Sequence, residues 1–259
     1  MRNTVLRTGG VIGVAAAAVL LASVTPAAAT TAGPGEGSAY GADASVSLLS
    51  GVLGQDALSV RTGELGASNT AGPNSASAVD ATLKGLVSAK AITSSANHDT
   101  ASGDVTAKAE LVQVALPVLA ALAGRTPTAS VISSQCHATA AGITGSSDLA
   151  DLDLGRIGDV AAATPNLTVG IPGVLQVTAD EQIHNADGSL TVNALDIKLL
   201  GGQLTGALGT GDIVLASSTC GPATAVATTP PAPGAPEVSV VPAGAPETGD
   251  GSLATVIVH

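Results

Sequence analysis

Apolar and polar residues alternate with a period of two over much of the middle of the chain. The clearest run is 105–111 (Val-Thr-Ala-Lys-Ala-Glu-Leu), in which every second side chain is apolar. This period is typical of a sheet with one face on a core and the other in water. An Asp187-Gly188 pair between two further runs of this kind predicts a hairpin turn at 185–188. The pattern predicts a mainly antiparallel all-β domain over residues 39–220, and we expect a β-sandwich.

Two segments depart from simple alternation. The run 190–194 changes phase before 195–199, so that Ala194 and Leu195 are consecutive apolar residues. One extra residue in a strand produces such a shift, so we expect a β-bulge here. Residues 112–122 have a composition compatible with a helix, which Pro117 would interrupt.

Composition narrows the functional classes. The 259 residues include Tyr40 as the one tyrosine, no Phe and no Trp, so the core must be built from aliphatic residues. Nine Lys and Arg stand against 20 Asp and Glu. A nucleic-acid or anionic-membrane binder needs a cationic footprint, and base stacking needs aromatic rings. We therefore expect no nucleic-acid partner.

The N-terminus is typical of a cleavable export signal. Two arginines in the first seven residues precede an apolar run over 11–24, and Ala27 and Ala29 supply the small residues that signal peptidase requires. Cleavage after Ala29 would make residues 1–29 a signal peptide and Thr30 the first mature residue. The apolar run is about 14 residues, shorter than the roughly 20 needed to cross a bilayer. We expect the mature chain to be exported and to have no transmembrane segment.

The two cysteines of the chain are consistent with export. Cys136 and Cys220 occupy matching surroundings, Ile-Ser-Ser-Gln-Cys and Ala-Ser-Ser-Thr-Cys, each after a stretch that is typical of a strand. An even number of cysteines in an exported chain favours one disulfide. A metal site would need more ligands, and a redox pair would usually be C-x-x-C.

Composition divides the mature chain into three regions. Residues 30–38 are expected to be a flexible lead-in, and 39–220 carry nearly all of the periodic apolar pattern. From 221 to 259 the chain is rich in Pro, Thr and Ala, which favours a disordered, extended stalk.

The stalk contains a sequence similar to a sorting signal. Ala245-Pro246-Glu247-Thr248-Gly249 resembles the sortase pentapeptide Leu-Pro-x-Thr-Gly. The expected apolar span and basic tail do not follow, because 250–259 contain only a six-residue apolar run and no Lys or Arg. A lost or truncated anchor and a chance match are both open, and we expect a chain that is mainly released rather than covalently anchored to the wall.

Candidate chemistry is sparse. Four aspartates could offer oxygen ligands to Ca²⁺, without the order of an EF-hand loop: Asp148, Asp151, Asp153 and Asp159. The histidines are scattered, and no hydrolase or nucleotide-binding motif occurs. Asp180 and Glu181 are adjacent, so in a strand they would point to opposite faces and make a poor acid–base pair. We expect no cofactor and no catalysis.

Several segments together resemble the choice-of-anchor P family of exported actinobacterial surface proteins. They are 38–41, both cysteines, 164–174, 180–182, 190–195 and 214–218. The resemblance covers roughly 38–220, and 164–220 is its specific part. It implies a surface domain joined to varying C-terminal anchors and brings no catalytic residues. The chain departs from the family at position 196, where Asp196 replaces an expected His.

These observations favour a non-catalytic structural or interaction protein, secreted by a Gram-positive actinobacterium or associated with its cell wall. Its expected partners are cell-wall or other surface components. The alternatives are an extracellular hydrolase with an unrecognised active-site geometry and a ligand-binding surface module. Convergence of carboxylates and histidines in one pocket would favour the hydrolase. The ligand, the partner and the oligomeric state are open.

Overall fold

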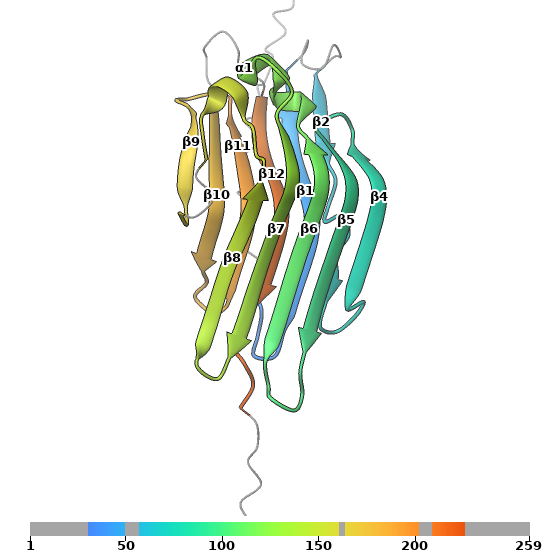
Figure 1. Cartoon of the computed structure of the whole chain (residues 1–259), viewed down its shortest axis with the longest axis vertical. Coiled ribbons are helices and arrows are strands. Elements are labelled where there is room, and N and C mark those ends of the chain that lie inside the picture. The colour runs from blue at the N-terminus through green and yellow to red at the C-terminus, as the bar shows by residue number, and fades with distance from the viewer. Residues whose placement is uncertain (1–30, 50–56, 161–163, 202–208, 226–259) are drawn as a thin grey trace, which may run out of the picture. The chain divides into compact units, whose positions relative to one another are not determined.

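Two antiparallel sheets form the fold, in a computed structural model that describes residues 31–49, 57–160, 164–201 and 209–225. All of these residues belong to one compact unit that ends at Ala225. The seven strands of the first sheet, here sheet A, are β1 (Gly37–Leu48), β2 (Leu58–Arg61), β3 (Ser68–Asn69), β9 (Leu167–Ile171), β10 (Leu175–His184), β11 (Leu190–Leu200) and β12 (Gly209–Cys220). The five strands of sheet B are β4 (Ser75–Leu83), β5 (Val87–His98), β6 (Val105–Ala115), β7 (Thr128–Thr139) and β8 (Gly142–Ala150). Figure 1 shows the two layers.

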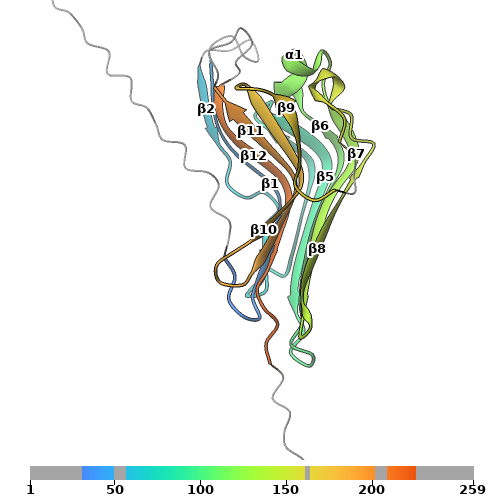
Figure 2. The same cartoon turned by 90° about the vertical axis from the view of Figure 1, so that its left-hand side faces the viewer.

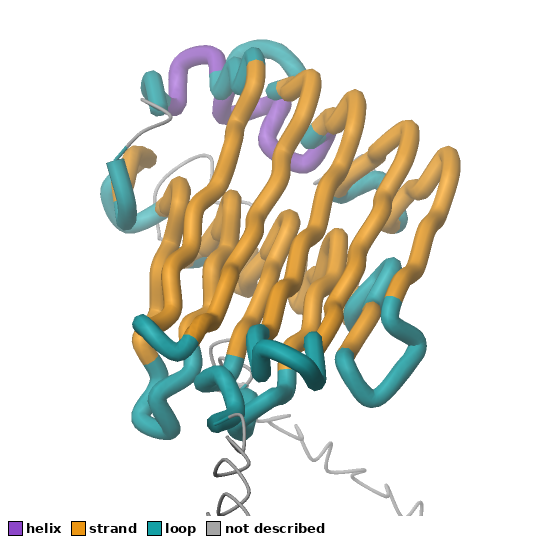
Figure 3. Tube along the Cα trace, turned by 60° about the horizontal axis from the view of Figure 1, so that its bottom comes forward, coloured by secondary structure: helices purple, strands orange, loops and turns teal. Residues whose placement is uncertain are grey.

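The predicted sandwich of antiparallel strands is confirmed. Sheet B is a meander in chain order, whereas sheet A runs β2-β1-β12-β11-β10-β9, with β3 also paired to β1. The first and the last strand of the domain are therefore neighbours in the middle of sheet A. Figure 3 shows the helical turns at one end of the two sheets.

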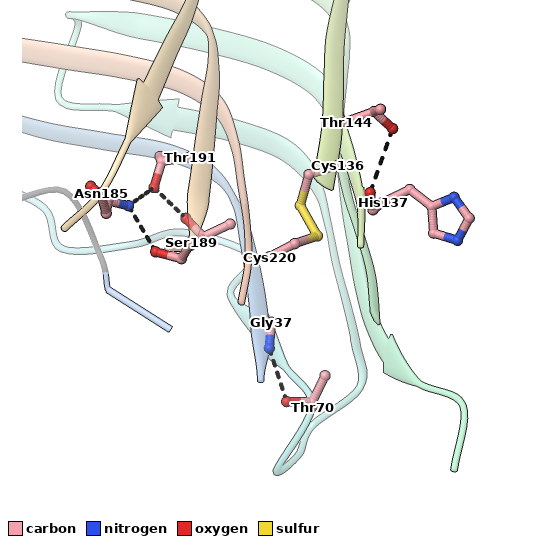
Figure 4. Close-up of a disulfide and its surroundings, with 10 residues drawn as sticks. Gly37, Thr70, Cys136, His137, Thr144, Asn185, Ser189, Thr191 and Cys220 are labelled. Carbon is pink, nitrogen blue, oxygen red and sulfur yellow. Dashed lines mark hydrogen bonds between the residues drawn. A yellow bond between two sulfur atoms is a disulfide. The ribbon is translucent and has the colours of Figure 1, made fainter. Parts of the chain in front are cut away.

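The predicted hairpin at 185–188 connects β10 to β11. The Asn185 N–H donates to the Ser189 carbonyl at 2.9 Å, and Gly188 has a φ of 83°, which glycine adopts without strain. The Asn185 side chain also donates to the hydroxyls of Ser189 and Thr191 (Figure 4).

Residues 112–122 form a helix only at their end. The strand β6 continues to Ala115, and Pro117 begins a 3₁₀ turn, η2 (Pro117–Leu119), followed by α1 (Ala120–Ala123). The proline interrupts the segment as predicted, but the residues before it are strand rather than helix.

The core between the sheets is aliphatic, and two glycines allow the sheets to approach closely. Its largest enclosed side chains are leucines and isoleucines such as Ile92 and Leu195. A Cβ at Gly41 would lie 2.0 Å from Ile92 Cγ2, and one at Gly145 would lie 2.3 Å from Val192 Cγ2. Glycine is therefore required where strands of opposite sheets meet most tightly.

Midway along sheet A, four neighbouring strands change the phase of their side chains at the same level. Asn193 and Asp196 are three residues apart in β11, yet both contact one polar network on the outer face. The pairing register of β10 and β11 is unchanged across this level, because Ala179 pairs with Leu195 and Glu181 with Asn193. The four residues at the phase change are Gly41, Asp180, Ala194 and Ala216.

The prediction of a β-bulge with one extra residue in a single strand is therefore wrong. Neighbouring strands shift together, so no strand gains a residue over its partner. Sheet B has an equivalent phase change, which forms a line across neighbouring strands at Asp80, Lys90, Gln113 and Ser130. Alternate strands on both lines have a positive φ, at Asp80, Gln113, Asp180 and Ala216. Figure 2 shows that both sheets curve in the same direction and that the concave face of sheet A is turned away from sheet B.

The predicted disulfide joins the two sheets. Cys136 in β7 is bonded to Cys220 at the end of β12, and their Cα atoms are 5.9 Å apart (Figure 4). Cys136 lies within its strand rather than at the end, because β7 continues to Thr139.

Residues 31–38 differ from the flexible lead-in that was expected. The Gly35 N–H donates to the Pro222 carbonyl at 2.8 Å, and the Gly221 N–H donates to the Glu36 carbonyl at 2.8 Å. The strand β1 already begins at Gly37. Both ends of the domain are therefore held against each other by backbone hydrogen bonds.

Candidate functional site

Polar side chains from several strands gather on the outer face of sheet A. One cross-strand row joins Tyr40, Ser217, Asn193 and Glu181, and a second contains Asp43, Val214 and Asp196. A third row places Lys198 beside Asp212. The set named here the sheet A patch consists of Tyr40, Asp43, Glu64, Glu181, Asn193, Asp196, Lys198, Asp212 and Ser217.

One side of the patch is a hydrogen-bonded network centred on a lysine. Lys198 Nζ lies 2.5 Å from Asp196 Oδ2 and 3.4 Å from Glu181 Oε1. Asn193 Nδ2 donates to Glu181 Oε2 at 2.8 Å. Asp196 is 3% exposed and Asn193 7%, although both point away from the core. We name these four residues the lysine side.

Burial governs the electrostatics of the lysine side. It raises the pKa of Asp196 to about 6, against the opposing hydrogen bond from Lys198 and with a further increase from the nearby Glu181 charge. Burial lowers the pKa of Lys198, but its bonds to Asp196 and Glu181 outweigh this and raise it overall. The ion pair is therefore formed at a cost in desolvation that Lys198 only partly offsets.

The other side of the patch, named the tyrosine side, contains Tyr40, Asp43, Glu64 and Asp212. Tyr40 is 8% exposed and hydrogen-bonds with Ser217, and its burial raises the pKa of its hydroxyl. Burial also raises the pKa of Glu64, with a contribution from Asp43, and the pKa of Asp212. Within the described ranges no salt bridge involves these three carboxyls. Lys198 pairs with Asp212 across the sheet, and its charge lowers the pKa of Asp212 against the larger effect of burial.

The four aspartates considered for calcium do not come together as a ligand set. Asp153 pairs with Arg125, whose hydrogen bond lowers the pKa of this carboxyl, and Asp151 accepts from Ser130. Asp148 lies in β8, and Asp159 follows η3 (Gly155–Ile157). In the described part of the chain no group of His, Cys, Asp and Glu side chains is arranged to hold a metal ion.

The adjacent carboxyls Asp180 and Glu181 lie in different environments, as expected. Asp180 Oδ2 accepts from Gln182, whose side chain also reaches the Gly145 carbonyl in sheet B. Glu181 belongs to the outer network. They are not placed as an acid–base pair.

None of the described surface pockets is lined by both a carboxylate and a histidine. A hollow of about 480 Å³ includes His184 and the β7–β8 turn, and its lining has no carboxylate. Another of about 480 Å³ lies between Gly124 and Gly155 and is lined by Arg125 and Arg156. Among these hollows, none offers the convergence that would favour a hydrolase.

Other predicted features lie outside the described residues. They are the cleavage site at Ala27, Ala29 and Thr30, and the sorting-like motif at 245–249. The part of the stalk beyond 225 lies outside them as well. Over the part of the chain with assigned structure, we find no helix with the length and apolar character needed to cross a membrane.

The sheet A patch was missed by the sequence analysis, although it left one trace. The phase change at 194–195 places Asn193 and Asp196 on one face. The sequence could not show that Tyr40 in β1 lies in the same patch as Asp196, because the two residues are far apart along the chain.

Comparisons of the chain with protein-family models, with curated proteins and with solved structures found no match.

Proposed function

We propose that this chain is a non-catalytic interaction protein, secreted by a Gram-positive actinobacterium and associated with its surface. The sheet A patch is its binding face. Its partners are cell-wall or other surface components, held by polar and charged contacts rather than by aromatic stacking.

The observation that supports this proposal is that some polar side chains of the patch are buried, while others carry negative charges outside any described salt bridge. Asn193, Asp196 and Ser217 are less than 9% exposed on an outer sheet face, where polar side chains are ordinarily left in water. Burying them costs free energy, and Asp43, Glu64 and Asp212 add charges that no described salt bridge offsets. Such an arrangement is typical of surfaces selected for binding rather than for stability.

Cell fractionation tests the proposal. The native chain and a variant with Asp43→Asn and Asp212→Asn would be produced in the native host and quantified in cytoplasm, membrane, wall and medium. A variant with Asp148→Asn and Asp80→Asn removes the same number of charges from sheet B and is the matched control. We expect the patch variant to shift from the cell surface to the medium and the control to stay. Equal distributions of all three, or an exclusively cytoplasmic native chain, would contradict the proposal.

A further inference from the structure

Two Gly-Arg dipeptides meet at the end of the sandwich that carries the helical turns (Figure 1). Gly124-Arg125 follows α1, and Gly155-Arg156 begins η3. A hollow of about 480 Å³ lies between them, and both arginines and no carboxylate line it. We propose that this hollow, here the arginine hollow, binds the oxyanion of a carboxylate or a phosphodiester.

Glycine is required in both dipeptides for the two turns to approach each other. Gly124 has a φ of 80° and Gly155 a φ of 60°, which are left-handed values that favour glycine. A Cβ at Gly155 would lie 2.5 Å from the Ala123 carbonyl oxygen, and one at Gly124 would lie 2.7 Å from Arg156 Nε. The guanidinium of Arg156 is therefore packed against the backbone of Gly124, which restricts where it can lie.

Arg156 differs from most of the described cations, because it has no partner. Four others form salt bridges with carboxylates: Lys90, Lys108, Arg125 and Lys198. Among the described residues, Arg156 forms no salt bridge, and its guanidinium donates no hydrogen bond. A packed guanidinium at a hollow therefore has all of its donors available.

The charge of the arginine hollow favours an anion. Arg125 donates to both carboxylate oxygens of Asp153, so Asp153 offsets one of the two positive charges. The charge of Arg156 remains, although the chain as a whole is acidic. The planar fork of a guanidinium matches the oxygens of a carboxylate or a phosphate two at a time. A singly charged oxyanion would therefore offset this charge and accept the free donors.

The arginine hollow is separate from the sheet A patch and from the last described residues. No residue of the patch lines it. The Thr224 N–H donates to the Gly103 carbonyl, just before β6 begins, whereas α1 follows the other end of β6. The eleven residues of β6 span about 35 Å. The inference therefore goes beyond the proposed function and does not rest on it.

The arginines also supply the assay. Residues 30–259 contain three of them, Arg61, Arg125 and Arg156, so the three side-chain Nε–H signals can be assigned in NMR spectra. The full chain purified from medium would be titrated at pH 6 and constant ionic strength with acetate, and separately with dimethyl phosphate. We expect saturable shifts of Arg125 and Arg156 and none of Arg61. The anion that binds more tightly tells a carboxylate ligand from a phosphodiester. The neutral analogues acetamide and trimethyl phosphate should cause no shift.

Variants locate the site, with the Arg125 signal as the readout. Arg156→Gln should weaken the affinity about tenfold, because it removes the unpaired charge and its donors. Arg61→Gln removes the same charge from an arginine that also lacks a described salt bridge, and it should leave the affinity unchanged.

A glycine variant separates the geometry of the hollow from its charge. Gly124→Ala keeps both arginines but places a Cβ against the Arg156 guanidinium, so it should also weaken binding. Gly173→Ala is the matched control, because Gly173 has a φ of 73° and open space around a Cβ. A thermal melt shows whether both variants fold, and Arg156→Gln remains the test if Gly124→Ala does not.

Four results would overturn the inference. They are a linear response of all three arginines, an equal response to the neutral analogues, no response at all, and equal affinities of the native chain and Arg156→Gln. Surface attachment in cell fractionation should not change in Arg156→Gln, so failure of the inference leaves the proposed function as it stands.

Discussion

Asp196 should make the stability of this protein fall as the pH rises from 4 to 6. Its carboxyl has a pKa of 3.8 in a model compound and about 6 in the folded chain, a difference caused mainly by burial. Each unit of pKa difference corresponds to about 1.4 kcal/mol, so the full effect is about 3 kcal/mol. Between these pH values the unfolded chain has released the proton while the folded chain retains it. Raising the pH therefore favours the unfolded chain, and the effect levels off above the folded pKa.

The substitution Asp196→Asn removes this titration while keeping the shape of the side chain. Urea denaturation at pH 4.5 and pH 7.0, followed by Tyr40 fluorescence, would give the free energy of unfolding of both proteins. From the two pKa values, the wild type should lose about 2 kcal/mol more than the variant between these pH values. Carboxyls that do not interact with Asp196 titrate alike in both proteins, so their contribution cancels in this difference.

Asp148→Asn, which changes a carboxyl in sheet B, is the control and should follow the wild type. The reasoning is refuted if the wild type and Asp196→Asn change in parallel. It is also refuted if the wild type gains stability relative to the variant as the pH rises. That result would mean that the bond to Lys198 outweighs the burial of the carboxyl.

Three further predictions concern the covalent and packing features of the fold. Replacing Cys136 and Cys220 together with alanine should lower the free energy of unfolding by about 4–5 kcal/mol in urea denaturation, because the bond closes a loop with a sequence separation of 84; a loss below 1 kcal/mol would contradict this. Gly41→Ala should cost about 1–3 kcal/mol because its Cβ would overlap Ile92 Cγ2, and Ile92→Leu, which lacks that second γ carbon, should recover part of that loss in the double variant. Intact-mass measurement of secreted protein should give a chain that begins at Thr30, and a mass that includes residues 1–29 would disprove cleavage after Ala29.

The elements that local chemistry dictates were predictable from the sequence. The Asp187-Gly188 turn and the alternation over 105–111 identify strands because turn geometry and side-chain period are local properties. The pairing of Cys136 with Cys220 followed from their even number, together with the expectation that the chain is exported. The extent of β6 was missed, because the composition of 112–122 as a whole is compatible with a helix, although Val112 and Val114 by themselves favour a strand.

The patch depends on register between distant strands, which no local pattern encodes. Ala194 and Leu195 show that β11 changes phase, but not that Gly41 and Ala216 do so at the same level. That alignment decides which polar residues share the outer face. The burial of Asp196 follows from neighbours contributed by β10 and β12, so its raised pKa could not be inferred from position 196 alone.

The most direct test of the central claim is to map which face of the domain contacts the cell envelope. Backbone NMR spectra of the labelled chain would be recorded with and without solubilised envelope fragments from the native host. The account predicts line broadening confined to sheet A, strongest at Tyr40, Asp196 and Asp212. Broadening centred on sheet B, at Thr93 or Gln135 for example, or no broadening at all, would contradict it.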